Sequence, residues 1–162
     1  MLKTAILISG RGSNMQSLVR ATQQDDFPAE IVCVISNKAD AAGLKWAEEQ
    51  GIPTATISHK DFDTREGFDK ALSEKIESYG AKFVCLAGFM RLLSPWFVEH
   101  WHDRSVNIHP SLLPSFPGLG VQQAALDYGA KFSGCTIHFL RAEMDHGPII
   151  IQACVPVLKD DT

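Results

Sequence analysis

The chain has 162 residues, of which 45% are hydrophobic and 21% are charged, the composition of an ordinary globular domain. The 15 Lys and Arg against 19 Asp and Glu give a net charge of −4, and no segment gathers basic residues into a stripe for nucleic acid. Apolar runs such as residues 5–8 and 149–151 are far shorter than the roughly 20 residues that cross a bilayer. We therefore expect a cytoplasmic protein that binds neither nucleic acid nor membrane.

The cysteines indicate a reducing compartment. They are widely spaced, form no C-x-x-C pair, and lie in apolar segments at positions 33, 85, 135 and 154. A four-cysteine zinc site would need paired ligands at close spacing. The pattern predicts buried free thiols and no metal site.

Hydrophobic patterning predicts that strands and helices alternate along the first part of the chain. Strands are expected at 3–8, 30–36, 53–58 and 82–87. Helices are expected from about Met15, from about Asp40 until just before Gly51, and from a capping box at 63–66 until just before Gly80.

In the second part, Ser94-Pro95 predicts the start of a short helix, followed by a strand at 104–109. A stiff loop with three prolines is expected at 110–118, and a helix at 121–128. Two further strands, at 132–140 and 148–157, have no helix-length segment between them and are expected to form an antiparallel hairpin. The order predicts one doubly wound, Rossmann-like α/β domain, with a mostly parallel sheet, helices on both faces and a C-terminal antiparallel hairpin.

A glycine-rich turn after the first strand, Gly10-Arg11-Gly12-Ser13-Asn14, favours an anion site. Glycines allow the backbone to approach a phosphate closely, and helix-start N–H groups attract it. Neither a dinucleotide fingerprint nor a P-loop fits, because Met15 stands where the first requires glycine and no Lys-Ser or Lys-Thr pair follows. A single phosphate is the functional interpretation, and a tight turn with Asn14 as an ordinary helix cap is the structural one.

A second group of polar residues suggests acid–base or oxyanion chemistry. Asn107 and His109 are two apart in a strand, so their side chains face the same side, and both can donate to an oxyanion. Asp145 lies in a loop, where it could hold His109 in its charged form. A hydrogen-bonded structural pair and a solvated loop aspartate are the alternatives.

Four segments together resemble the folate-dependent phosphoribosylglycinamide formyltransferases. They are Ser9-Gly10-Arg11-Gly12-Ser13-Asn14, Leu86-Ala87-Gly88-Phe89-Met90-Arg91, Asn107-Ile108-His109-Pro110-Ser111-Leu112-Leu113-Pro114 and Asp145-His146-Gly147-Pro148. The resemblance implies transfer of a formyl group from 10-formyltetrahydrofolate to the amine of glycinamide ribonucleotide, in purine biosynthesis. It also implies small-molecule substrates, no metal, and a monomer or homodimer.

Site residues follow from the resemblance position by position. The catalytic residues would be Asn107, His109 and Asp145, and the substrate phosphate would bind at Gly12, Ser13 and Asn14. The folate would contact Arg65, Met90, Arg91, Leu92, Leu93, Arg141, Ala142, Glu143 and Met144. The amine would attack the formyl carbon directly, Asn107 and His109 would stabilise the oxyanion, and Asp145 would assist a water-borne proton relay.

The chain departs from the family pattern in two places. Gly120 stands where the family often has histidine after Pro-Gly-Leu. Residues 1–162 are expected to form a single formyltransferase domain without the C-terminal helix and strand, which in the family give a carboxylate to the substrate ribose.

Alternative functions remain open at this stage. A relative could use another acceptor, as formyltetrahydrofolate hydrolase and methionyl-tRNA formyltransferase do, or could bind a phosphometabolite without catalysis. His100 and His102 cannot share a metal on a helix, because residues two apart diverge by about 200°. His138 is interpreted as a core or cleft histidine that could border the site.

Overall fold

The computed structural model describes residues 1–161 and divides into two compact units. The first unit is Met1–Ser105, and the second runs from Val106 to the C-terminus. The predicted catalytic residues belong to the second unit, the predicted phosphate residues to the first, and the predicted folate residues to both. The two units are therefore described in turn.

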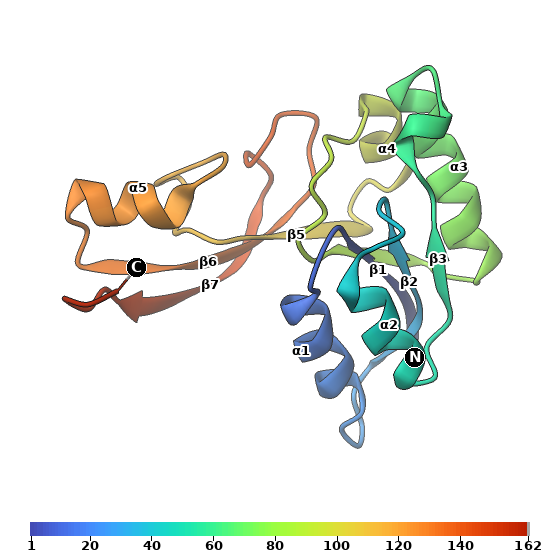
Figure 1. The fold of residues 1–162 in the computed structure, drawn as a ribbon, viewed down its shortest axis with the longest axis horizontal. Helices are drawn as coiled ribbons and strands as arrows, with labels where there is room; N and C mark the ends of the chain where they lie inside the picture. The colour runs from blue at the N-terminus through green and yellow to red at the C-terminus, as the bar shows by residue number, and fades with distance from the viewer. Residues whose placement is uncertain (162) are drawn as a thin grey trace. The chain divides into compact units, whose positions relative to one another are not determined.

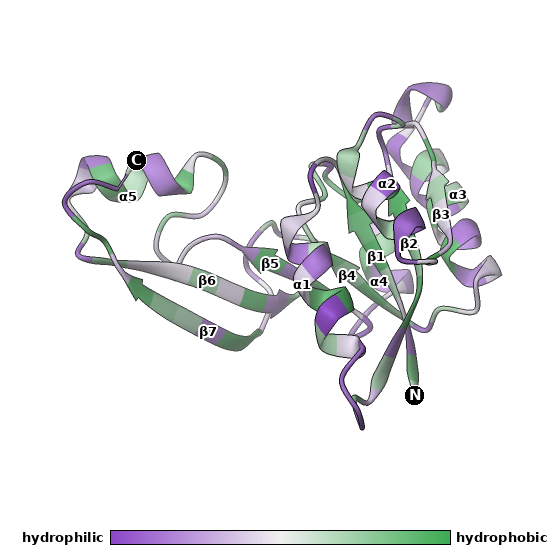
Figure 2. Cartoon of the chain, turned by 60° about the horizontal axis from the view of Figure 1, so that its bottom comes forward, coloured by the Kyte–Doolittle hydropathy of each residue, from purple (hydrophilic) through white to green (hydrophobic). Residues whose placement is uncertain are grey.

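The first unit contains four parallel strands. They are β1 (Leu2–Ile8), β2 (Ala29–Ser36), β3 (Thr54–Thr56) and β4 (Phe83–Leu86), in the order β3-β2-β1-β4. Residues 4–8 of β1 are all buried, as in a central strand that is covered on both faces. Figure 2 shows the resulting hydrophobic colour along β1 and β4.

Helices cover both faces of this sheet (Figure 1). They are α1 (Ser13–Thr22), α2 (Ala42–Glu49), α3 (Arg65–Ser78) and α4 (Pro95–His100), with a 3₁₀ turn, η1, at His59–Asp61. Ile6 and Ile8 of β1 pack with Met15 and Val19 of α1 and with Leu44 of α2. The alternate β1 residues face the other side of the sheet, where α3 and α4 lie.

The predicted order of strands and helices in this unit is confirmed, and the main differences are at β3 and at the start of α3. β3 has three residues rather than the six expected at 53–58, because Ser58 instead accepts a hydrogen bond from the Lys60 amide and starts η1, which was not predicted. Thr64 alone caps α3, with its hydroxyl 3.0 Å from the Gly67 amide, so the predicted capping box at 63–66 is wrong in detail. Ser94 caps α4 and Pro95 begins it, as expected.

The second unit contains an antiparallel sheet and one helix. Its strands are β5 (Ser105–His109), β6 (Phe132–Phe139) and β7 (Ile149–Pro156), in the order β5-β6-β7, and its helix is α5 (Val121–Tyr128). The predicted β6–β7 hairpin is confirmed. All eight residues of β7 are exposed, including Ile149, Ile150 and Ile151.

The prediction of four buried thiols is only partly right. All four cysteines are free, but only Cys33 is fully buried, Cys85 and Cys135 are half-buried, and Cys154 is exposed. Cys154 lies on β7, where the apolar sequence does not correspond to burial. Among residues 1–161, no helix combines the length and the apolar character that crossing a bilayer requires.

Candidate functional site

The pairing of β5 with β6 places polar side chains on one face of the second unit. Asn107 is opposite His138 and His109 is opposite Thr136. Because directly paired residues in a sheet project to the same face, these four side chains share one side of the strand pair. His109 and His138 are 4% and 3% exposed, so the cluster is shielded from bulk water.

Asp145 enters the same cluster from the loop between β6 and β7. Its Oδ1 lies 3.4 Å from His109 Nδ1 and 3.9 Å from His138 Nε2. Its Oδ2 accepts a hydrogen bond of 2.9 Å from the Gly118 amide. The side chain of Asp145 is 7% exposed, so the carboxylate is a buried charge whose neighbours are hydrogen-bond donors and imidazoles.

His109 is held through both ring nitrogens. Nε2 donates to the Phe116 carbonyl at 2.9 Å, and the Ser111 hydroxyl donates to the same oxygen at 2.9 Å. Nδ1 lies 3.4 Å from Asp145 Oδ1, so an acceptor oxygen faces each ring nitrogen. Phe116 and Asp145 have φ angles of 51° and 58°, a backbone conformation that residues other than glycine rarely adopt.

His138 orients the amide of Asn107. Nδ1 of His138 lies 3.0 Å from the Phe139 carbonyl and therefore donates to it. In this tautomer Nε2 accepts, and Nδ2 of Asn107 lies 3.3 Å away. An amide nitrogen carries two hydrogens, so Asn107 has a second N–H with which to bind a ligand oxygen.

The structure thus brings together the three residues predicted to be catalytic. It also places His138 within the site, as one of the two interpretations allowed. Thr136 was missed: its hydroxyl donates to the Ser111 carbonyl at 2.7 Å and accepts from the Leu113 amide at 3.1 Å. Thr136 is two residues from His138 in the same predicted strand, and this spacing could have placed its side chain on the same face of the strand.

The predicted phosphate residues lie at the start of α1 in the first unit. Gly12 occupies the N-cap with φ 72°, and no side chain caps the helix, so the alternative with Asn14 as the cap is wrong. A hollow of about 210 Å³ is lined by Ser9–Asn14, Ala87, Gly88 and Met90. A Cβ on Gly43 would lie 3.1 Å from the Gly10 carbonyl oxygen and 2.6 Å from Ile8 Cδ1, so glycine lets α2 approach the turn closely.

The predicted folate residues fall into two groups, one in each unit. In the first, Arg65 begins α3, and Met90 and Leu92 are 65% and 53% exposed on the segment after β4. In the second, the loop after β6 carries residues 141–144, in which Arg141 donates to the Leu140 carbonyl at 2.7 Å. The assignment of both groups to folate remains a prediction.

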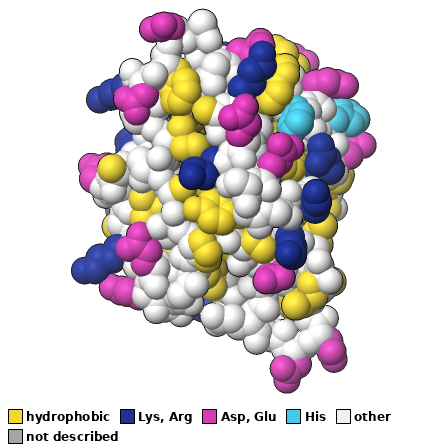
Figure 3. All heavy atoms as spheres, turned by 90° about the vertical axis from the view of Figure 1, so that its right-hand side faces the viewer, with side chains coloured by type: hydrophobic (Ala, Val, Ile, Leu, Met, Phe, Trp, Pro, Cys, Tyr) yellow, Lys and Arg dark blue, Asp and Glu magenta, His cyan; other side chains and the backbone are white. Residues whose placement is uncertain are grey.

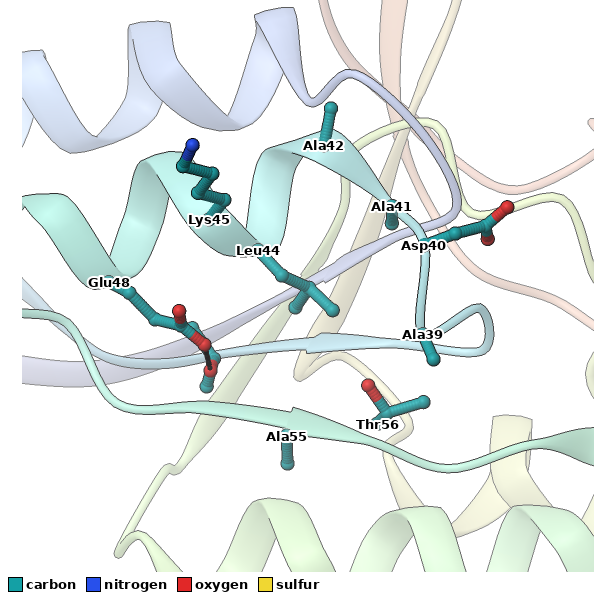
Figure 4. Close-up of a pocket in the computed structure, with 10 residues that line it drawn as sticks. Ala39, Asp40, Ala41, Ala42, Leu44, Lys45, Glu48, Ala55 and Thr56 are labelled. Atoms are coloured by element: carbon teal, nitrogen blue, oxygen red, sulfur yellow. Dashed lines mark hydrogen bonds between the residues drawn. The ribbon is translucent and has the colours of Figure 1, made fainter.

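A larger hollow, of about 490 Å³, contains none of the predicted residues (Figure 4). It lies between α2 and β3, where Glu48 accepts a hydrogen bond of 2.7 Å from Thr54. Lys45 and Asp40 add opposite charges. It has no buried acid–base group, so its size does not make it the candidate site.

Charges elsewhere do not define another site. On the face turned to the viewer in Figure 3, acidic and basic side chains are intermixed. Within residues 1–161, no group of three or more His, Cys, Asp or Glu side chains is arranged to hold a metal ion.

Comparison with known proteins identifies the family. The family described as formyl transferase matches residues 2–162. The chain belongs to the formyl transferase family. The phosphoribosylglycinamide formyltransferase of Escherichia coli (strain K12) is 45% identical over 161 residues, which are 99% of this chain and 76% of that protein. The glycinamide ribonucleotide transformylase 1 of Symbiobacterium toebii has a solved structure with a TM-score of 0.96 and 44% identity, covering all of this chain and 76% of that one.

A longer protein also contains a segment that is similar to this chain. The trifunctional purine biosynthetic protein adenosine-3 of Drosophila melanogaster is 52% identical over 161 residues. This chain spans 12% of its length and 16% of the length of the Bos taurus protein of the same name. The structural likeness confirms the predicted fold class, a mostly parallel α/β sheet with a C-terminal antiparallel hairpin.

Proposed function

We propose that this chain transfers a formyl group from 10-formyltetrahydrofolate to the primary amine of glycinamide ribonucleotide in de novo purine biosynthesis. The observation that carries the proposal is the cluster of Asn107, His109 and Asp145, in which a buried carboxylate lies 3.4 Å from an imidazole on a strand shared with a donor amide. Relatives named for this activity support the choice of substrates.

The proposed reaction begins when the substrate amine attacks the formyl carbon. The carbonyl oxygen becomes an oxyanion, which the second N–H of Asn107 binds more strongly than it binds the uncharged carbonyl. His109 also donates to it, with Nε2 exchanging the Phe116 carbonyl for the oxyanion. A proton then moves from the attacking nitrogen through a water to N10 of the folate. Asp145 orients that water and keeps His109 charged. The C–N10 bond breaks, leaving the formylated amide and tetrahydrofolate without a covalent enzyme intermediate.

The remaining binding residues are part of the same proposal. Gly12, Ser13 and Asn14 would bind the ribonucleotide phosphate, since the helix start offers backbone N–H groups to an anion. The folate would contact Arg65 and residues 90–93 and 141–144. Residues 1–162 would act as one formyltransferase domain in the cytoplasm, as a monomer or homodimer.

The test is a steady-state assay with 10-formyl folate and three acceptors: glycinamide ribonucleotide, methionyl-tRNA and water. We expect transfer to glycinamide ribonucleotide, with little product from the other two. Asp145→Asn should remain folded, because an amide oxygen can still accept a hydrogen bond from the Gly118 amide. Its kcat should fall by roughly tenfold to a thousandfold. Full activity of this variant would remove Asp145 from the mechanism. Product from water or tRNA alone would favour the alternative acceptors.

A further inference from the structure

The segment between β4 and α4 is attached at two points by buried side chains. It begins after Leu86 and ends at Ser94, the N-cap of α4. Between the attachments, Met90 and Leu92 are 65% and 53% exposed. An exposed segment between two buried anchors has a fixed backbone and side chains free to contact a ligand.

The first anchor is a relay from Asn37 through Ser9. The Met90 amide donates to Ser9 Oγ at 2.8 Å, and the Ser9 hydroxyl donates to Asn37 Oδ1 at 2.5 Å. Ser9 and Asn37 are 6% and 4% exposed. They follow β1 and β2, which neighbour each other in the sheet, and β4 pairs with β1 on its other side. The relay therefore links the carboxyl ends of three adjacent strands.

The second anchor is Asp69 of α3. Its side chain is fully buried, and Oδ2 accepts a hydrogen bond of 2.5 Å from the Ser94 amide. Oδ1 has no hydrogen-bond partner among the described residues. An asparagine at this position could accept the same bond, so the anchor depends on the acceptor oxygen.

We infer that Ser9, Asn37 and Asp69 are positioning residues that fix the segment Met90–Leu93 for binding of the folate. The inference rests on the proposed function, since that proposal makes the segment part of the folate site. None of the three residues needs to touch the reacting atoms. They reduce the ordering that the segment must undergo when the folate binds, which affects folate affinity more than the chemical step.

Variants of the two anchors test this role. Asn37→Leu and Asp69→Leu remove the acceptors, whereas Asp69→Asn keeps one. Ser73→Ala is the matched control, because it removes another buried hydrogen bond of α3, from Trp101 Nε1 at the C-cap of α4 to Ser73 at 3.0 Å, without involving the segment.

Kinetics should separate positioning from general destabilisation. We expect both leucine variants to raise the KM for 10-formyl folate by at least about tenfold, with kcat and the KM for glycinamide ribonucleotide changed less than about threefold. Asp69→Asn should have a folate KM close to that of the unmodified chain. Ser73→Ala should lower the melting temperature but leave the folate KM unchanged. Equal changes in all three kinetic parameters, or an unchanged folate KM in the leucine variants, would overturn the inference.

Amide hydrogen exchange gives a readout that does not depend on catalysis. The Met90 and Ser94 amides should exchange slowly in the unmodified chain, and Asn37→Leu should accelerate Met90 selectively. Exchange at Met90 as fast as in an unbonded loop would contradict the anchors even in an active enzyme. Slow exchange in a chain without formyl transfer would support the anchors while the proposed function failed. If Asp69→Leu does not fold, Asn37→Leu and Asp69→Asn still decide the question.

Discussion

The proposed mechanism assigns its chemistry to single side chains, and Asn107 provides its clearest test. Asn107→Ala should lower kcat by roughly 10²–10³, about 2.7–4 kcal/mol, because it removes one of the two proposed oxyanion donors. The KM values should change little, since the uncharged formyl oxygen needs this donor less. Gln123→Ala is the control, because Gln123 is exposed on α5 and bonds only its neighbour Asp127 in the described structure. Unchanged kcat in Asn107→Ala would leave His109 as the only donor.

Residue types and spacing allowed the prediction of Asn107, His109 and Asp145, but not of their surroundings. The two-residue spacing on one strand placed Asn107 and His109 together, and the loop carboxylate Asp145 was a candidate partner of His109. The family resemblance gave the three residues their predicted catalytic role. The supporting contacts of Asp145 and His109, with the Gly118 amide and the Phe116 carbonyl, come from an irregular loop. Loop conformation depends on tertiary packing rather than periodicity, so no sequence pattern indicated these partners.

At the scale of elements, the loop between β6 and β7 depends on a close backbone approach at Gly147. A Cβ there would lie 1.6 Å from the Phe139 carbonyl oxygen. Gly147→Ala should therefore lower the free energy of unfolding by about 1–3 kcal/mol, because the backbone must move to make room for the methyl group. Gly10→Ala is the control for stability, since a Cβ at Gly10 would meet nothing within 4 Å. Thermal unfolding of both variants measures the difference, and equal melting temperatures would contradict the expectation.

The contact between α3 and α4 should make stability depend on pH through Asp69. Burial raises the pKa of Asp69, and the Ser94 hydrogen bond, Arg65 and Arg91 only partly oppose the shift. A carboxyl with a raised folded pKa stabilises the fold below its unfolded pKa, near 3.9, and loses this contribution as pH rises through the folded value. Relative to Asp69→Asn, the unmodified chain should lose stability as pH increases above about 4. Urea unfolding at several pH values measures this difference, and a gain with pH would be the opposite result.

Hydrophobic patterning predicted the order of the strands and helices well, because buried strands and helices both show their apolar residues at a clear spacing, every two residues in a strand and every three to four in a helix. It failed where few residues form the element. β3 pairs through only three residues, so Ser58 could leave the strand and cap η1. The capping pattern at 63–66 contained two possible caps, Asp63 and Thr64, and the structure has Thr64 as the cap.

At the scale of the whole molecule, thiol reactivity should distinguish the cysteines of the two units. Burial raises the pKa of Cys33 to about 12 and that of Cys85 to about 11. At pH 8 the Cys33 thiolate would be roughly 1 part in 10,000, so alkylation should be very slow. Cys154 is exposed and should react first. Mass spectrometry after brief treatment with iodoacetamide measures the order, and early labelling of Cys33 would contradict its burial.

The exposed strand β7 has a consequence for handling the polypeptide. Among the described residues it pairs with β6 alone, so its other edge offers unpaired amides beside three consecutive isoleucines. Such an edge is a template for adding a strand from another molecule, and no charged side chain within Ile149–Pro156 opposes this. Self-association by edge pairing would therefore increase with protein concentration. It could be limited by working with dilute samples or by substituting glutamate for residues of this strand.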